Sequence, residues 1–427
     1  MFCMNVKASD IISYSILDDN TTLTQQNFVE HINQIVIVQP EYLHATAKYY
    51  ELDQNKKYAQ RLRFPTLDAQ IVNDRSIKRD INTGDALRKI RDDSFDGVIR
   101  IDQPLYKGNE INSRVKLAKS DISYSDIDRK EIASDLIINA SDIYLNAANS
   151  VLVSDYSKKL LDKMLKYRET AKARFNAGAI ENSELALINI RISEIEVKQA
   201  LLDADKTQML SIYLSFFRDD YNDLGLPLFQ MLDTDEEDLI NFKDNSYQQL
   251  KSEIDVNKAR HNLEITKSQY RPQLGFSMRY TQYDIDEDAE DNDLRGGIYF
   301  SLPLFNFGRG TAQINAGKAK INQAKIYRDQ TTRDSENINA QIFGAFYGSL
   351  QARNRILESY NNVKLQRETF EIRMVGSSFA VPALLEAVAK EISLYEQLVN
   401  NEKKLLMADL NRRHLNRQLL NRFYISF

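Results

Sequence analysis

The most regular pattern in the chain is a narrow apolar seam at helical spacing. Ile188, Ile192 and Ile195 follow one another at intervals of four and three residues, and Leu202 lies one heptad after Ile195. Lysine, glutamate, aspartate, serine and asparagine occupy most of the positions around the seam. Such spacing is typical of helices that pack side by side in a coiled coil. Taken alone, the seam also fits an ordinary helical bundle or a rod of helical repeats.

The prolines mark where very long helices can form. Two long gaps separate them, from Pro104 to Pro227 and from Pro303 to Pro382. Proline removes a backbone hydrogen bond and clashes with the preceding turn, so uninterrupted helices are expected only inside such gaps. At 1.5 Å per residue, the first long helix would extend roughly 100 Å. The predicted helices cover about 108–175, 182–216, 308–374 and 382–420.

Segments of strict alternation predict one strand hairpin in each half of the chain. Alternation at period two over about ten residues is typical of a strand with one exposed face. The predicted strands cover about 64–74, 95–105, 272–283 and 295–305. The apolar side of the second hairpin carries Phe276, Met278, Tyr280, Ile298, Phe300 and Leu302. The polar side carries Ser277, Arg279, Thr281 and Ser301.

These strands fit two environments. In a soluble protein the apolar side would face a core, whereas in a membrane barrel it would face lipid while the polar side lined water. Four strands are too few to close a barrel, because about eight form the smallest one known. Open edges in lipid would leave backbone groups without hydrogen-bond partners. If the strands span a membrane, several copies of the chain must therefore share one barrel.

An internal repeat organises the chain. The segment 95–119 is similar to 295–320, and Pro104 and Pro303 occupy matching positions, 303 − 104 = 199 residues apart. A duplication with an offset of about 200 residues explains these matches. The predicted organisation is an N-terminal segment 1–22, a first repeat 23–216, an acidic connector 217–245 and a second repeat 246–427.

The order of these elements resembles the TolC-like outer-membrane efflux protein family. The resemblance is carried by RPQL at 271–274, GIYFSLPLFNFG at 297–308, VPALLEA at 381–387 and the repeat glycines Gly178 and Gly376. It implies a mainly α fold with a small β part, in which three identical chains contribute four strands each to a twelve-stranded outer-membrane barrel. It also implies a periplasmic tunnel of coiled-coil helices. The segments DQPLY and KSDISYS are loosely similar to members that serve type I secretion.

The resemblance further implies a function and its partners. It implies a passive exit duct in the outer membrane that works with a periplasmic adaptor protein and an inner-membrane transporter. The turns at Gly178 and Gly376 would form the periplasmic tip, and Glu184 and Glu386 would narrow its aperture. Acids at a helix start also suit the helix dipole, so a plain solvated helix start is the alternative for both. The competing function is that of a periplasmic or cytosolic coiled-coil structural or adaptor protein.

Composition and termini add constraints. The net charge of −5 over 427 residues is unlike the basic surface of a nucleic-acid-binding protein. No uninterrupted apolar run is long enough to predict a transmembrane helix. Residues 1–22 lack the basic start and apolar core of a signal peptide, which an exported protein needs, so an exported chain would be either a mature form or one with a truncated start. Cys3 leaves a lipidated N-terminus open, although the apolar segment that should precede it is absent.

No catalytic, cofactor-binding or metal site is predicted. The four histidines are not spaced as paired metal ligands, and GRG at 308–310 lacks the Gly-Lys-Ser/Thr of a phosphate loop. The acidic loop 283–293 leaves calcium binding open, since carboxylates are calcium ligands. The alternative for this loop is a solvated turn.

Overall fold

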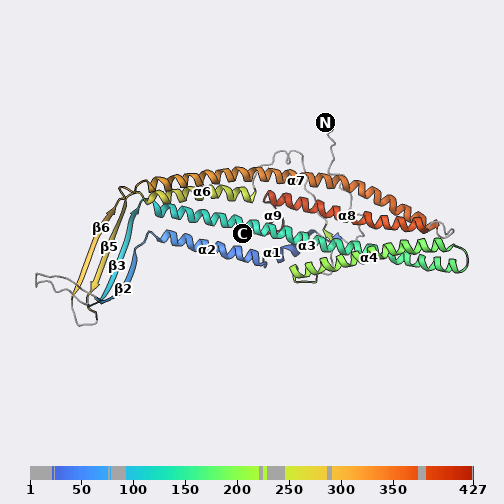
Figure 1. The fold of residues 1–427 in the computed structure, drawn as a ribbon, viewed down its shortest axis with the longest axis horizontal. Helices are drawn as coiled ribbons and strands as arrows, with labels where there is room; N and C mark the ends of the chain where they lie inside the picture. Colours follow the sequence, from blue (N-terminus) through green and yellow to red (C-terminus); the bar gives the residue numbers. More distant parts are fainter. Residues whose placement is uncertain are drawn as a thin grey trace, which may run out of the picture. The chain divides into compact units, whose positions relative to one another are not determined.

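The computed structural model describes residues 22–23, 25–75, 77, 93–220, 225–227, 246–285, 291–373, 381–425 and 427. The predicted fold class is confirmed, because long helices dominate the chain and four strands form one small antiparallel sheet (Figure 1). The elements are β1 (Thr22–Leu23), α1 (Gln25–Val36), α2 (Pro40–Arg61), β2 (Thr66–Arg75), β3 (Asp93–Lys107), α3 (Glu110–Asn176), α4 (Asn182–Phe217), β4 (Leu226–Pro227), α6 (Tyr247–Ser268), β5 (Gln273–Gln282), β6 (Asn292–Ser301), α7 (Arg309–Arg373), α8 (Val381–Leu415) and α9 (Leu419–Arg422).

The chain divides into two compact units. The first, called the helical unit below, contains Met1–His44, Arg129–Tyr247 and Thr332–Phe427. The second, called the sheet unit, contains Ala45–Asp128 and Gln248–Thr331. Each unit therefore draws on both halves of the sequence.

The long helices follow from local sequence. The 67 residues of α3 include neither glycine nor proline, so nothing in its backbone chemistry interrupts the helix. Proline begins α2 and is the second residue of α8, positions where its missing N–H has no helical partner to lose.

In the helical unit, the seam predicted on α4 is buried. Ile188, Ile192, Ile195 and Leu202 all have almost no solvent exposure, and Gln199 between them is buried too. On α3 the buried positions in the middle of the helix include Ala133, Leu136, Ile137, Tyr144 and Ala147, which form a stripe broader than a single seam. Side-chain bonds from α3 to both α4 and α8 explain this width, because a helix that packs against two neighbours buries a broader stripe.

The sheet unit holds four strands in the order β2-β3-β5-β6, all antiparallel. Pairing of β3 with β5 joins the hairpin of the first half to that of the second. The register shifts between Pro104 and Tyr106, where proline has no N–H to give to the ladder. β6 ends at Ser301, two residues before Pro303, so Leu302 lies outside the strand predicted to contain it.

The same backbone feature follows both hairpins. Gly108 and Asn109 have φ values of 56° and 75°, and Phe307 and Gly308 have φ values of 50° and 82°. The two pairs are 307 − 108 = 199 residues apart, the offset found between Pro104 and Pro303. Two successive left-handed residues are unusual, so their recurrence at this offset is what a duplicated segment would show.

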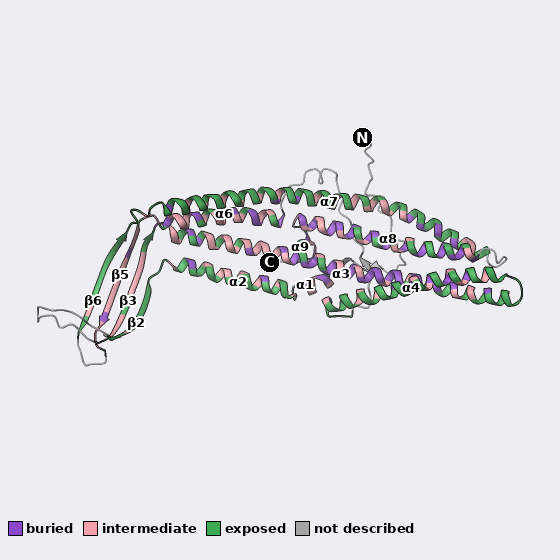
Figure 2. Ribbon diagram, in the orientation of Figure 1, coloured by how far each residue is buried: buried purple, intermediate pink, exposed green. Residues whose placement is uncertain are grey.

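Among the described residues, one helix reaches the length and hydropathy of a membrane span. An 18-residue window of α3 has a mean hydropathy of 1.2, and 67% of that window is buried inside the structure. A search for uninterrupted apolar runs misses this window. Buried core helices pass the same test; Figure 2 shows buried and half-buried positions along α3.

Candidate functional site

The first candidate feature is the apolar face of the four-stranded sheet. Register places Ile298 opposite Phe276 and Phe300 opposite Leu274, and the predicted apolar residues Met278 and Tyr280 share this face. Ile298 and Phe300 are 71% and 66% exposed. Figure 2 shows the edge strands as largely exposed ribbons. Further apolar side chains on this face are Leu67, Ile71, Ile99, Ile101 and Leu294.

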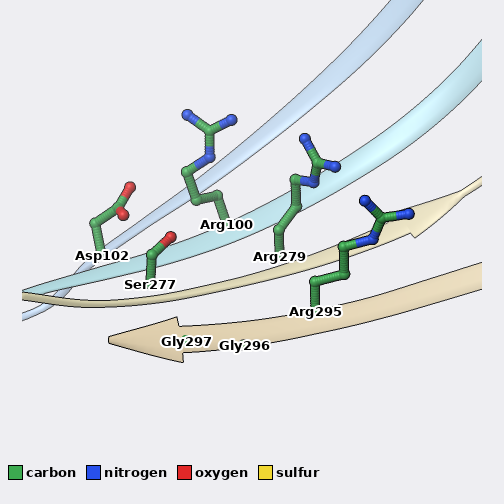
Figure 3. A pocket seen from close by; sticks show the side chains of 7 residues that line it. All are labelled: Arg100, Asp102, Ser277, Arg279, Arg295, Gly296 and Gly297. Carbon is green, nitrogen blue, oxygen red and sulfur yellow. The ribbon is translucent and has the colours of Figure 1, made fainter. Parts of the chain in front are cut away.

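The opposite face of the sheet is polar. Ser277, Arg279 and Thr281 alternate along β5, and Ser301 joins the same face through its pairing with Gln273. Thr281 is buried within the sheet unit, whereas Ser301 is exposed. A shallow hollow of about 290 Å³ lies on this face, lined by Arg100, Asp102, Ser277, Arg279, Arg295, Gly296 and Gly297 (Figure 3).

The edges of the sheet are open in the single chain. β2 and β6 each pair with one strand within the described residues, so one side of each strand has unbonded backbone groups. Open edges of this length readily pair with another strand. A sheet with one apolar exposed face and two open edges is incomplete as a soluble structure.

Aromatic side chains gather where the strands meet the helices. Phe307 is 91% exposed, its ring packs edge-on against Phe305 at 4.6 Å, and Phe305 is also exposed. Phe64, just before β2, and Tyr106, near the end of β3, are exposed as well. Aromatic girdles of this kind border the lipid-facing band of membrane barrels.

The second candidate feature is the turn between α3 and α4. Gly178 has a φ of 71°, its N–H donates to the Phe175 carbonyl at 2.9 Å, and the Ala179 N–H donates to the Arg174 carbonyl at 2.8 Å. This pair of bonds is the Schellman arrangement that ends helices at glycine. A side chain at position 178 would meet no atom within 4 Å, so the backbone conformation explains the glycine. The matching residue Gly376 lies outside the described residues.

The two candidate aperture acids lie on different helices. Glu184 is in the first turn of α4 and is half-exposed, while Glu386 is exposed in the second turn of α8. The pKa of Arg191 is raised by its hydrogen bond to Glu194, and the charge of Glu386 raises it further. The negative charge of Glu386 on α8 therefore acts on the Arg191 guanidinium of α4.

A buried charged network ties α3, α7 and α8 together. Glu391 has no solvent exposure and accepts hydrogen bonds from Tyr156 and from Arg367, both at 2.5 Å. Arg367 also donates to Glu371 at 2.9 Å. Burial lowers the pKa of Arg367, but its hydrogen bonds to Glu391 and Glu371 outweigh burial and raise the pKa overall. Burial, reinforced by the hydrogen bond to Glu391, raises the pKa of Tyr156.

Sequence reasoning missed this network. Its members are separated by up to 235 residues, and each polar residue looks like a surface position when read alone. The spacing of apolar residues on α8 could have indicated that Glu391 is buried. Glu391 lies between Val388 and Ile392 in the sequence, and all three residues are buried.

The described residues contain no group of three or more histidine, cysteine, aspartate or glutamate side chains that could hold a metal ion. Five of the eleven residues of the acidic loop considered for calcium, 286–290, lie outside the described residues, as does Cys3.

Comparisons with solved structures define the class of the fold. CusC, studied for the changes that accompany its folding and transmembrane channel formation, matches with a TM-score of 0.75 and 12% identity over 93% of this chain and 92% of its own. The CmeC outer membrane channel of Campylobacter jejuni matches with a TM-score of 0.74 and 14% identity, over 92% of this chain and 86% of CmeC. The outer membrane protein VceC of Vibrio cholerae matches with a TM-score of 0.72 and 13% identity, over 93% of this chain and 97% of VceC.

The chain thus has the fold of TolC-like outer-membrane channels along nearly its whole length, and the resemblance read from the sequence is confirmed at the level of the fold. No protein-family model and no curated protein sequence matches the chain.

Proposed function

We propose that this chain is one protomer of an outer-membrane export channel, in which three copies share a twelve-stranded barrel. The observation that carries the proposal is the sheet, which has an exposed apolar face, a polar opposite face and open edges at β2 and β6. Neighbouring copies would pair β6 of one chain with β2 of the next, and lipid would cover the apolar face. The open edges would then be paired and the apolar face would be covered.

The helices would form the periplasmic part of the duct. The resemblance to known channels supports a tunnel in which α3, α4, α7 and α8 of each chain line the passage, with the Gly178 turn at its tip. A periplasmic adaptor and an inner-membrane transporter would deliver small molecules or a secreted protein to this passage. The duct itself would be passive, since the transporter supplies the energy.

A structural or adaptor role is the second candidate, and the sheet argues against it. A soluble coiled-coil rod gains nothing from Ile298 and Phe300 in water, where their burial elsewhere would stabilise the fold. The proposal and this alternative therefore differ in what covers the apolar face.

Cross-linking between the two sheet edges tests the proposal. In a Cys3→Ser background, Gln70→Cys on β2 and Gly297→Cys on β6 place thiols on the polar face of opposite edges. A short thiol-reactive cross-linker applied to isolated outer membranes should give covalent dimers and trimers. The Gln70→Cys and Gly297→Cys single variants are the matched controls and should stay monomeric on denaturing gels.

The contradicting outcome is equally clear. Recovery of the protein as a soluble monomer, with no intermolecular product from the double variant, would reject the trimeric barrel. Fractionation on a density gradient, performed on the same samples, reports the compartment independently of the cross-link.

The tip acids form a subsidiary part of the proposal. If Glu184 and Glu386 line the aperture, replacing both by alanine should lower the preference of the channel for cations in planar bilayers. Glu194→Ala is the matched control, because Glu194 pairs with Arg191 at 2.9 Å and is not assigned to the aperture. A reversal potential unchanged in the double variant would assign both acids to a solvated helix start.

A further inference from the structure

Three arginines lie side by side across the polar face of the sheet. Register pairs Arg100 of β3 with Arg279 of β5, and Arg279 in turn with Arg295 of β6. Directly paired residues on neighbouring strands have Cβ atoms about 5 Å apart and point to the same side. Figure 3 shows the three guanidinium groups projecting from one side of the ribbon.

A row of three positive charges is electrostatically unfavourable unless negative groups balance it. Like charges directly opposite one another on paired strands repel. Asp68 lies opposite Arg100 in the register, yet within the described residues neither Arg100 nor Arg279 forms an ion pair or hydrogen bond. Arg295 pairs with Asp293 at 2.5 Å. Two guanidinium groups thus keep all their donors available.

The row borders a space that can admit a ligand. The hollow of about 290 Å³ is walled by the arginines, with Ser277 and the side-chain-free Gly296 and Gly297 among its other lining residues. One water occupies roughly 30 Å³ in the liquid, so the hollow has room for an oxyanion with part of its hydration shell. Nothing lies within 4 Å of a side chain added at Gly297, which leaves that part of the wall clear.

Aspartates on the same face do not cancel the row. Five aspartates share this face: Asp68, Asp74, Asp96, Asp102 and Asp293. Asp96 and Asp74 lie four and six residues along their strands from the row, and Asp293 is already paired with Arg295. An aspartate carboxylate lies close to its backbone, whereas an arginine places its charge several bonds further out. At the level of the row the outermost groups are therefore cationic.

We propose that Arg100, Arg279 and Arg295 form an anion-binding band on the inner wall of the barrel, which takes the carboxylate or phosphate groups of anionic cargo. The inference rests on the proposed trimer, because only a closed barrel turns the three rows into a ring. Guanidinium groups stay charged at every physiological pH and bind oxyanions with two parallel hydrogen bonds. The band would favour anions at this level of the duct.

Planar-bilayer recording of the purified full-length channel tests the inference. The variants are Arg279→Gln and the triple variant Arg100→Gln, Arg279→Gln, Arg295→Gln. Inorganic phosphate, added to one aqueous side of a zwitterionic bilayer, is the probe. Wild type should be partly blocked by phosphate, and the triple variant should need about tenfold more phosphate for the same block. Its reversal potential in a potassium chloride gradient should shift toward cations.

Arg61→Gln is the matched control, because it removes one charge from an exposed arginine of α2, a helix not assigned to the passage, and should change neither reading. A conducting triple variant with unaltered block and reversal potential would overturn the band and leave the channel proposal standing. Absence of any trimer or conductance in wild type would overturn both. A block that followed added anionic lipid instead of aqueous phosphate would assign the arginines to lipid headgroups and also overturn the band.

Discussion

The two regions of this chain differ in how much they expose apolar side chains to solvent, and Phe28 and Phe300 are examples. Phe28 has no solvent exposure and packs edge-on against Tyr144 at 5.0 Å within the helical unit, whereas Phe300 on β6 is 66% exposed. Full burial of such a side chain contributes about 1.5–3 kcal/mol, so a row of exposed ones is a large unrealised gain in water. The helical unit has a closed apolar core, whereas the exposed apolar face of the sheet suits the lipid contact proposed above.

Charged residues show the reverse arrangement. The helical unit buries Glu391 and Arg367 against each other, and it also buries Glu402, which pairs with the half-buried Arg353 at 2.5 Å. The sheet instead leaves Arg100 and Arg279 without partners among the described residues. These buried charges of the helical unit are paired, whereas the two arginines of the sheet are available, as the proposed wall of an aqueous passage requires.

The same truncation in both regions gives the largest expected contrast. Phe28→Ala should lower the free energy of unfolding by about 3–5 kcal/mol, because it leaves a cavity in a closed aromatic core. Phe300→Ala should cost less than about 1 kcal/mol in detergent, where the side chain has no fixed protein partner. Urea unfolding followed by circular dichroism measures both. Equal costs would show that the sheet face is covered by protein.

Removing one partner of the buried network should have the next largest effect. Arg367→Met leaves Glu391 buried with Tyr156 as a remaining donor, and we expect a loss of about 3 kcal/mol, the low end for a broken buried pair. Arg355→Met is the control, since its pair with Glu358 is exposed and should contribute less than about 1 kcal/mol. Similar small losses for both variants would mean that the network adds nothing to stability.

Local patterns predicted most of the fold. The proline gaps, the α4 seam and the strand alternation are all patterns among residues near one another in the sequence. The helices and the two faces of the sheet could therefore be predicted directly from the sequence. The error at Leu302 has the same origin, because alternation continues past Ser301 although Pro303 prevents the ladder from doing so. The broad buried stripe on α3 arises from a second packing partner that no local pattern reveals.

The candidate sites were only partly predictable. Arg279 could be assigned to the polar side from alternation, but its alignment with Arg100 and Arg295 depends on the register between strands. The network around Glu391 joins three helices across long sequence separations. Contacts of this kind are set by tertiary packing, and a single sequence contains no direct signal for them.

A charge on the apolar face should separate lipid from water as its covering. Ile298→Arg should destabilise the membrane-inserted protein by about 2 kcal/mol or more, since arginine on the lipid face of a barrel costs roughly 2–4 kcal/mol near the midplane. Ser301→Arg on the polar side of the same strand is the matched control and should cost far less. The fraction of heat-resistant trimer in outer membranes reports the difference. A loss of trimer that was equal in the two variants would contradict a lipid-facing assignment.

The smallest predicted effect concerns pH and involves His31 of the helical unit. His31 stacks on Phe217 at 4.9 Å and shares a 2.8 Å hydrogen bond with the Tyr213 hydroxyl. Burial lowers the pKa of His31, partly opposed by the charge of Asp219.

Because the pKa of His31 in the folded state lies below its unfolded value of about 6.5, the unfolded chain takes up the proton first as pH falls. The contribution of His31 to stability is therefore complete above about pH 6.5 and is lost as pH falls through the lowered folded pKa. Urea midpoints at pH 7.5 and pH 5 should fall more on acidification for wild type than for His31→Gln, which keeps a hydrogen-bonding group for Tyr213. His44→Gln is the control and should behave like wild type. An equal decrease in wild type and His31→Gln would assign the acid sensitivity of the helical unit to other groups.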